Sequence, residues 1–348
     1  MSTQVDKLEF VILVDNCIEW ISTLPPGFTH EVPNHMVRPP PHQPPKDPLT
    51  GLPILDLDNY CCGAHGLAIH MVSVLFDAGP EPLSIERNVK AMAVPLEKLD
   101  AIVLSHWHRD HSGGIVRALE MRQALTSQPL KVDLHPARPL RRGISQPPNP
   151  KPLIALPADP TFEEIGAANG KVELHDEFHE LDGSGVGVSG EIKRRYEFER
   201  GLPGAITYMK DGDEEGWFTD ELIKDERYIA VDVKGKGLVI FSSCSHAGIC
   251  NVIADAMERY SRPIHMVVGG FHLVPTAQQP MKETIDFLAR RLQPTPKFVL
   301  PLHCTGLEAR GKLSAAMGEA CIPAGVGMKV VCSATEDAQD DVDLRVLD

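Results

Sequence analysis

Short apolar runs alternate with polar loops along the chain and predict several buried strands. The runs of strand length are Leu8 to Asn16, which ends in a polar turn, Val72 to Phe76, Ala101 to Ser105, Tyr228 to Val233, Gly237 to Ser242, Ile264 to Val268 and Phe298 to Leu302. The tripeptide Lys234-Gly235-Lys236 predicts a hairpin turn between two of these strands.

Three other segments carry apolar residues at helical spacing. One follows Gly113-Gly114 and continues to about Leu125, another covers Asn251 to Tyr260, and the third runs from about Met281 to Leu292. Their apolar faces predict packing against a core rather than a cofactor site.

Two proline-dense stretches interrupt this pattern. Between Pro25 and Pro53 about one residue in three is proline, which excludes a central strand or helix. Residues 126 to about 200 are also rich in proline and predict an irregular structure. We expect a single domain over residues 1–348, with a proline-rich insertion at 25–60 and a second one at 126–225 that is a plain insertion or a lid over the active site.

The charge balance and the cysteines narrow the class of protein. The 34 Lys and Arg against 48 Asp and Glu give a net charge of -14, which disfavours a nucleic-acid backbone as partner. No run approaches the roughly 20 apolar residues that span a bilayer, and no leader sequence is evident. The eight cysteines form no C-x-x-C pair, which is typical of reduced thiols. We expect a cytoplasmic protein without a membrane segment, and leave its oligomeric state open.

The segment His106-Trp107-His108-Arg109-Asp110-His111 is the strongest chemical signal. It follows a predicted strand and precedes a glycine pair. Imidazole nitrogens and a carboxylate on a rigid loop are the donors that a metal site needs. In an extended loop His106 and His108 point to one side and would share one ion, while Asp110 and His111 turn toward a second. The alternative is a histidine-rich surface turn, which does not explain why later histidines, at 246, 272 and 303, also stand where strands end.

Several further segments accompany the histidine motif. They are His65-Gly66-Leu67, Leu75-Phe76-Asp77-Ala78-Gly79, Gly190-Glu191-Ile192, Cys244-Ser245-His246-Ala247-Gly248-Ile249, Gly269-Gly270-Phe271-His272-Leu273 and His303-Cys304-Thr305-Gly306. Together these motifs resemble the metallo-β-lactamase superfamily, and within it the 7,8-dihydropterin-6-methyl-4-(β-D-ribofuranosyl)aminobenzene-5'-phosphate synthase-like branch. The similarity runs from about Val14 to about Leu307. The resemblance implies an α/β fold, the αββα sandwich, with a binuclear metal site at the strand ends.

The resemblance also implies a role for each matching residue. The expected ligands are His106, His108 and His246 for the first ion, and Asp110, His111 and His303 for the second. Asp77 would hydrogen-bond behind these ligands and fix their orientation. The superfamily usually has a bridging aspartate after a later strand, where this chain has Gly-Gly-Phe-His-Leu, so His272 is the expected donor there.

For several other residues near these motifs, the sequence allows two different roles. Either Cys244 or Cys304 would suit zinc as a thiolate, although a small buried residue is the favoured interpretation of both. The pair Asp15-Asn16 would line the pocket or cap a turn. His65 belongs to the family pattern and has no role that follows from its chemistry.

Basic residues in the second insertion predict contacts with an anionic small-molecule substrate. The candidates are His135, Arg138, Arg141 and Arg194. Arginine suits phosphate or carboxylate groups because its planar fork donates two parallel hydrogen bonds. The alternative is a solvated basic face.

We expect a metal-dependent hydrolase acting on a small ester, lactone, thioester or phosphoester. Two ions, expected to be Zn²⁺ with Mn²⁺ or Fe²⁺ as alternatives, would lower the pKa of a shared water. Asp110 would orient that water or return its proton to the leaving group. The resemblance implies a rival activity, the transferase-type condensation of a pterin diphosphate with a ribosyl-aminobenzene phosphate. A non-catalytic metal-binding protein is the third hypothesis.

Overall fold

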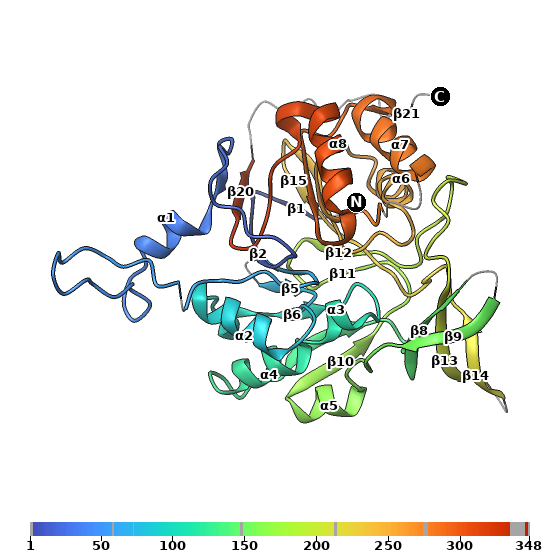
Figure 1. Ribbon diagram of the computed structural model, residues 1–348, viewed down its shortest axis with the longest axis horizontal. Coiled ribbons are helices and arrows are strands. Elements are labelled where there is room, and N and C mark those ends of the chain that lie inside the picture. Colours follow the sequence, from blue (N-terminus) through green and yellow to red (C-terminus); the bar gives the residue numbers. More distant parts are fainter. Residues whose placement is uncertain are drawn as a thin grey trace.

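The computed structural model describes residues 3–57, 59–71, 73–146, 149–211, 214–273, 278–334 and 345–346. Within these ranges two large sheets face each other, and helices cover both outer faces (Figure 1). This is the αββα arrangement, so the predicted fold class is confirmed. Across the described helices, none combines the length and the apolar composition needed to cross a membrane.

The first sheet has eight strands among the described residues. Their order is β10 (Gly170–Leu174), β7 (Leu130–Leu134), β6 (Ala101–Val103), β5 (Val74–Phe76), β4 (Ala68–Met71), β2 (Lys7–Val14), β20 (Lys329–Ser333) and β3 (Phe28–Thr29). From β5 to β10 neighbouring strands are parallel, so their carboxyl ends meet at one edge of the sheet. Val72, which the sequence analysis included in the strand that became β5, lies outside the described residues.

The second sheet has seven strands among the described residues. Their order is β11 (His179–Glu180), β12 (Val186–Val188), β15 (Ile229–Val233), β16 (Gly237–Ser242), β17 (Ile264–Gly270) and β19 (Phe298–Leu302), with β1 (Gln4–Val5) beside β15. Strands β15 and β16 form the predicted hairpin, whose turn places Gly235 at φ 73°. Strands β16, β17 and β19 are parallel and also end at one edge.

The core has three layers of apolar side chains. The central layer lies between the sheets, where Phe10 of β2 meets Phe241 of β16 edge to face with ring centroids 5.0 Å apart. The second layer packs the eight-stranded sheet against α2 (Pro82–Ala91) and α4 (Ile115–Gln123). The third packs the other sheet against α6 (Ile249–Tyr260), α7 (Gln278–Asp286) and α8 (Leu307–Met317). The predicted helices therefore have their apolar faces in the core.

The first proline-rich stretch leaves the body of the protein as an arm (Figure 1). It begins with the short helix α1 (Glu31–Met36) and continues without regular strands or helices through the described residues up to 57. Apolar side chains such as Leu49 and Leu52 are exposed on it. Before α1, the two residues of β3 pair with β20 at the edge of the first sheet. Prolines remove backbone donors, which explains why the residues from α1 onward pair with neither main sheet.

The second proline-rich stretch is more regular than predicted. Its first and middle parts supply β7, β10, β11 and β12 to the two main sheets, together with α5 (Phe162–Ala167). A separate sheet has the order β14 (Glu214–Thr219), β13 (Ala205–Asp211), β8 (Arg141–Gln146) and β9 (Asn149–Ala155). The prediction of an irregular insertion was wrong here, because short strands between prolines pair with partners far away in the sequence.

The remaining short elements connect these layers. They are α3 (Arg109–Ser112), the 3-10 turns Leu96–Lys98, His303–Thr305 and Gly318–Ala320, the π-helical turn Phe287–Arg291 that continues α7, and the strand pair β18 (Leu292–Gln293) and β21 (Arg345–Val346).

Candidate metal centre

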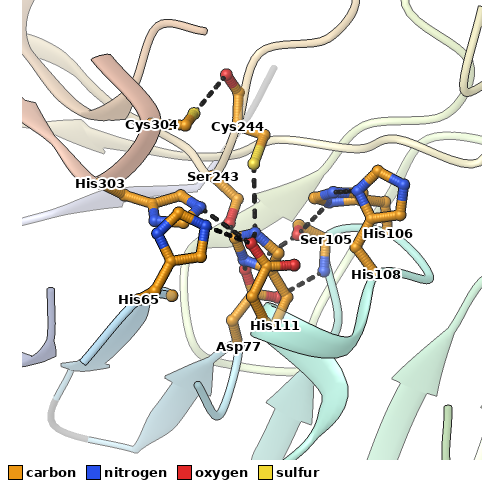
Figure 2. A network of polar contacts seen from close by, with 12 residues as sticks. His65, Asp77, Ser105, His106, His108, His111, Ser243, Cys244, His303 and Cys304 are labelled. Carbon is orange, nitrogen blue, oxygen red and sulfur yellow. Dashed lines mark hydrogen bonds and ion pairs between the residues drawn. The ribbon is translucent and has the colours of Figure 1, made fainter. Parts of the chain in front are cut away.

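Strand ends from both sheets meet at one place and deliver the candidate ligands (Figure 2). In the eight-stranded sheet, β5 is followed by Asp77, and β6 by the loop that contains His106 and His108. In the other sheet, β16 leads to Cys244 and His246, and β19 to His303. Side chains separated by more than one hundred residues are thus brought together by the parallel arrangement of the strands.

The backbone is strained at these strand ends. Asp77, Ser245, His272 and His303 have φ angles of 59°, 61°, 44° and 44°, a left-handed conformation that is uncommon for residues other than glycine. Such residues persist only where the surrounding structure holds them, and they gather at functional sites. The strain therefore marks the same place as the histidines.

Three imidazoles form the first group of potential ligands. His106 Nε2 lies 2.9 Å from His108 Nδ1, which in turn lies 3.2 Å from His246 Nε2. Burial lowers the pKa of His108 to about 3, aided by the Arg142 guanidinium, and it lowers the pKa values of His106 and His246 well below their usual range. The rings are therefore neutral and present lone pairs to a common point.

The second group combines nitrogen, oxygen and sulfur donors. His111 Nε2 lies 3.1 Å from Cys244 Sγ and 3.6 Å from Asp110 Oδ2, and the same Asp110 oxygen lies 3.2 Å from His303 Nε2. Burial alone would raise the pKa of Asp110, but His111 and His303 hold it well below its usual range. An ionised carboxylate, two imidazoles and a thiol are thus gathered within reach of one ion.

Asp77 holds the ligand loops from behind. Its Oδ1 accepts a hydrogen bond from the Ser105 backbone NH at 2.7 Å, and its Oδ2 accepts from Ser105 Oγ at 2.8 Å and from Ser243 Oγ. The same Oδ2 lies 2.9 Å from His111 Nδ1, so this nitrogen donates to it and leaves Nε2 to face Cys244. The same network reaches His106 through Ser105 Oγ, 2.8 Å from His106 Nδ1.

The chemistry of these residues fits a divalent transition ion. The buried ring nitrogen His303 Nε2 lies 3.2 Å from Asp110 Oδ2 and has no hydrogen-bond partner. A buried imidazole nitrogen that faces other donors without a hydrogen bond is costly unless a cation satisfies it. Imidazole, carboxylate and thiol donors together suit zinc and neighbouring transition metals.

Asp15 and Asn16 position His303 from the end of β2. Asp15 Oδ1 accepts a hydrogen bond from the His303 backbone NH at 2.5 Å, and Asn16 Oδ1 lies 3.0 Å from His303 Nδ1. Asp15 also accepts from the Cys17 NH at 3.0 Å, so the pair both supports His303 and caps a turn. Asn16 further contacts His65, whose Nε2 lies 3.6 Å from Asp110 Oδ2.

His272 and Cys244 differ from the expectation drawn from the sequence, because Cys244 lies in a group of potential ligands and His272 does not. The His272 ring lies with its centroid 4.5 Å from that of His246, but it contributes no ligand atom to either group. Cys244, which was interpreted as a small buried residue, points its thiol at His111 Nε2 (Figure 2). The Cys304 thiol donates to the Cys244 carbonyl at 3.3 Å and stands outside both groups.

The segment Asp225-Glu226-Arg227, which precedes β15, supports the ligand loops and was missed by the sequence analysis. Asp225 Oδ2 accepts from the Trp107 NH at 2.7 Å, and Glu226 accepts from the NH groups of His246 and Ala247 at 2.8 and 2.6 Å. The Arg227 NH donates to the Ser105 carbonyl at 2.8 Å. The available signal was the run of four charged residues from Lys224 to Arg227, directly before the strand predicted to begin at Tyr228.

The basic residues of the second insertion lie in different surroundings. Arg194 Nη1 donates to the His246 carbonyl at 3.3 Å, which puts this guanidinium beside the ligand loop. Arg138 donates to the carbonyls of Asp159 and Pro160 at 2.6 and 2.8 Å.

The other two candidates stand further from the ligands. Arg141 lies exposed on β8 and donates to the Leu140 carbonyl at 2.6 Å. The carbonyl of His135 accepts from Trp107 Nε1 at 2.8 Å. Of the four candidates, Arg194 is the one that contacts a ligand residue.

Comparisons with known proteins agree with this architecture. Residues 72–196 match the family model of the metallo-beta-lactamase superfamily. An uncharacterized protein of Methanocaldococcus jannaschii is 28% identical over 248 residues, covering 71% of this chain and 85% of that protein. The 7,8-dihydropterin-6-methyl-4-(beta-D-ribofuranosyl)-aminobenzene-5'-phosphate synthase of the same organism is 28% identical over 254 residues, covering 68% and 76%.

A solved structure shares the fold over most of the chain. Tm1679, described as a metal-dependent hydrolase of the beta-lactamase superfamily, matches with a TM-score of 0.67 at 19% identity, covering 94% of this chain and 99% of that one. Sequence match and fold agree: residues 72–196 are similar to the metallo-β-lactamase superfamily, the chain has its fold, and the sequence resembles the dihydropterin-ribofuranosylaminobenzene phosphate synthase-like branch.

Proposed function

We propose that the protein is a metal-dependent hydrolase with a binuclear centre. The observation that carries this proposal is the pair of adjacent ligand groups at the strand ends, one of three imidazoles and one of mixed donors. The proposed ligands are His106, His108 and His246 in the first group and Asp110, His111, His303 and Cys244 in the second. Zn²⁺ is the expected ion because it favours nitrogen and sulfur donors, with Mn²⁺ or Fe²⁺ as alternatives.

Ions held in these groups would supply an acidified water and polarise the substrate oxygen. The chain's own contribution is orientation and proton transfer. Asp110 accepts the proton of the attacking water, or returns it to the leaving group, because its ionised carboxylate faces the ligands while a quarter of the side chain is exposed. His65, 3.6 Å from Asp110 Oδ2 and 71% exposed, is placed to exchange that proton with solvent.

The substrate class that fits best is a small ester, lactone, thioester or phosphoester with an anionic group. Arg194 is the proposed anchor for that group, because its guanidinium lies at the backbone of His246. A cation beside the ligands attracts an anion although the whole chain carries a net charge of -14.

The alternative function is a synthase-like transfer at the same residues. It is favoured by the relative that is named a dihydropterin-ribofuranosylaminobenzene phosphate synthase and is 28% identical to this chain. In that reaction a diphosphate leaves, and the same ligand groups and Arg194 would face its negative charge.

A turnover screen of the full chain separates these functions. Protein reconstituted with Zn²⁺, Mn²⁺ or Fe²⁺ is assayed with lactones, thioesters, phosphodiesters, and pterin diphosphate together with ribosyl-aminobenzene phosphate. We expect hydrolysis of at least one ester class, lost in His106→Ala/His108→Ala and retained in the exposed control His42→Ala. Turnover of the pterin pair alone would replace the hydrolase with the transferase.

A further inference from the structure

A third group of potential metal ligands lies apart from the centre described above. His175 Nδ1 and His179 Nε2 each lie 2.7 Å from the same oxygen, Asp133 Oδ2. The two rings are stacked with centroids 4.0 Å apart, and the three ligand atoms lie within 4.8 Å of one another. The proposed hydrolase uses none of these residues.

Rigid elements of both sheets hold this group. Asp133 is buried on β7 of the eight-stranded sheet, whereas His179 begins β11 of the other sheet. His175 follows β10 directly, and its NH donates to the Leu134 carbonyl at 3.0 Å. The loop between the two histidines is anchored by Phe178, whose ring faces Arg259 at 4.5 Å. The donors are thus arranged in advance at the junction of the sheets.

The neighbouring groups bind the outer atoms of Asp133 and His179 and leave Asp133 Oδ2 and His179 Nε2 available to a cation. Asp133 Oδ1 accepts from Arg227 Nη1 at 2.6 Å, which leaves Oδ2 to the two histidines. His179 Nδ1 lies 3.1 Å from the Glu177 carbonyl, so Nδ1 carries the proton. A neutral His179 then directs the lone pair of Nε2 at a carboxylate oxygen 2.7 Å away. This contact is repulsive unless a cation lies between the two atoms.

Two cations would relieve the repulsion, a proton or a metal ion. A proton makes His179 an imidazolium stacked on the His175 ring, with the Arg227 guanidinium on the other oxygen of the same carboxylate. A divalent ion instead accepts lone pairs from both rings and from the carboxylate. Second partners such as the Glu177 carbonyl and Arg227 orient ligands in this way at known metal sites.

The geometry points to a separate site for a divalent transition ion, with Zn²⁺ as the expected species, bound by Asp133, His175 and His179 where the two sheets meet. Bonds of about 2.0 Å in tetrahedral geometry separate ligand atoms by roughly 3.3 Å. Both rings would therefore move outward by about half an ångström, which their 37% and 20% exposure permits. The same exposure leaves the fourth position to water.

The site would act on the fold rather than on a substrate. Arg227, which grips Asp133, also donates to the Leu104 carbonyl at 2.6 Å and through its NH to the Ser105 carbonyl at 2.8 Å. These carbonyls lie at the end of β6, immediately before the ligand loop of the main centre. An ion at Asp133 would thus clamp the two sheets next to that loop.

Native mass spectrometry of the metal-free full chain titrated with Zn²⁺ tests this site. We expect His175→Ala/His179→Ala to bind one ion fewer than the wild-type chain, while the exposed control His42→Ala binds the wild-type number. Both histidines are partly exposed, so the double variant should stay folded, which circular dichroism checks. Equal ion numbers in all three proteins, or the same loss in the control, would overturn the inference.

A second measurement uses the wild-type chain and does not depend on a variant. Long-range ¹H–¹⁵N spectra of the imidazoles, assigned with the two single variants, are recorded during the Zn²⁺ titration. We expect the His175 Nδ1 and His179 Nε2 resonances to move to the shifts of metal-bound nitrogens. If they keep the shifts of a protonated pair up to a tenfold excess of Zn²⁺, the group is a hydrogen-bonded cluster and the inference fails.

Discussion

At the scale of single residues, the two carboxylates of the centre, Asp110 and Asp77, have different roles. Asp110 is itself a potential ligand, whereas Asp77 lies behind the ligands and accepts hydrogen bonds from two serines and His111. The thiol of Cys244 adds a sulfur donor that faces His111 Nε2. These assignments lead to two predictions about individual side chains.

Replacing Asp77 with asparagine should weaken metal binding by about 10-fold to 100-fold. The amide is neutral and no longer favours the proton on His111 Nδ1, so His111 Nε2 is less well prepared to bind an ion. Competition with a chromophoric chelator measures the affinity, with the exposed Asp100→Asn as control. Equal affinities of both variants would remove Asp77 from this role.

Replacing Cys244 with serine should abolish the sulfur-to-metal charge-transfer absorption of the Co²⁺-loaded protein. Cys304→Ser is the matched control, because its thiol donates to a backbone carbonyl and stands outside both ligand groups. We expect the absorption to persist in Cys304→Ser. Its persistence in Cys244→Ser would show that Cys244 is a buried neighbour rather than a ligand.

At the scale of elements, parallel strand ends deliver the ligands and one short segment ties them together. Residues Asp225 to Arg227 precede β15 and accept or donate hydrogen bonds at both ligand loops. Asp225 also forms an ion pair with the buried Arg142 guanidinium, 2.6 Å away. The segment therefore links the stability of the fold to the geometry of the centre.

Replacing Asp225 with alanine should lower the free energy of unfolding by about 1–3 kcal/mol, because the buried Arg142 loses one of its two carboxylate partners and keeps Asp220. The control is Asp182→Ala. This variant breaks a surface ion pair between Lys131 and Asp182, whose side chain is 88% exposed. That loss should stay within about 1 kcal/mol. Urea unfolding of the metal-free proteins measures both, and similar losses would contradict this account of the segment.

Helix α1 provides a test by pH at a distance from the metal centre. Burial raises the pKa of Glu31 to about 7 although Arg38 opposes the shift. The folded protein then binds more protons than the unfolded chain, so the free energy of unfolding falls as pH rises from about 4.5 to 7. At about 1.4 kcal/mol per pKa unit the Glu31 share is at most about 3 kcal/mol.

The variant Glu31→Gln isolates this share. We expect the difference in unfolding free energy between wild type and variant to shift in the variant's favour between pH 4.5 and 7. Urea unfolding across that range measures it, with the exposed Glu97→Gln as control. A pH-independent difference would mean that the Glu31 carboxyl is not shifted in the folded state.

At the scale of the whole molecule, two sheets are held together by apolar packing and by polar groups at their ends. A continuous apolar layer lies between the sheets. At the strand ends, however, buried metal-donor atoms of the two sheets lie close together, where they repel one another or lack a hydrogen bond unless a cation is bound. Bound ions should therefore stabilise the entire fold. Binding to the folded state alone adds about 2.7 kcal/mol when the free ion is at 100 times its Kd.

Removing metal with a chelator should lower the thermal midpoint of the chain, and added Zn²⁺ should restore it. Differential scanning calorimetry of chelated, dialysed and reloaded protein measures the shift. His106→Ala/His108→Ala should lose most of the response because half of the main centre is gone. An unchanged midpoint in the wild-type chain would argue against resident ions.

Much of the centre was predictable from the sequence because its signals are local. The motif from His106 to His111 needs six consecutive residues, and a buried strand before a histidine places that histidine at a sheet edge. Parallel strands end at the same edge, so His246 and His303 were expected beside it. The αββα fold followed from the resemblance, and both the fold and the family match confirmed it.

The tertiary structure decided what depends on backbone angles and on distant partners. The left-handed backbone at His272, φ 44°, is not readable from its neighbours, and the ring ends up against His246 while the Cys244 thiol faces His111. The second insertion has regular structure because the short strands between its prolines pair with one another and with the main sheets. Sequence thus determined which donors stand at strand ends, whereas folding decided which of them lie within reach of a common ion, because that depends on ångström-scale distances between separate loops.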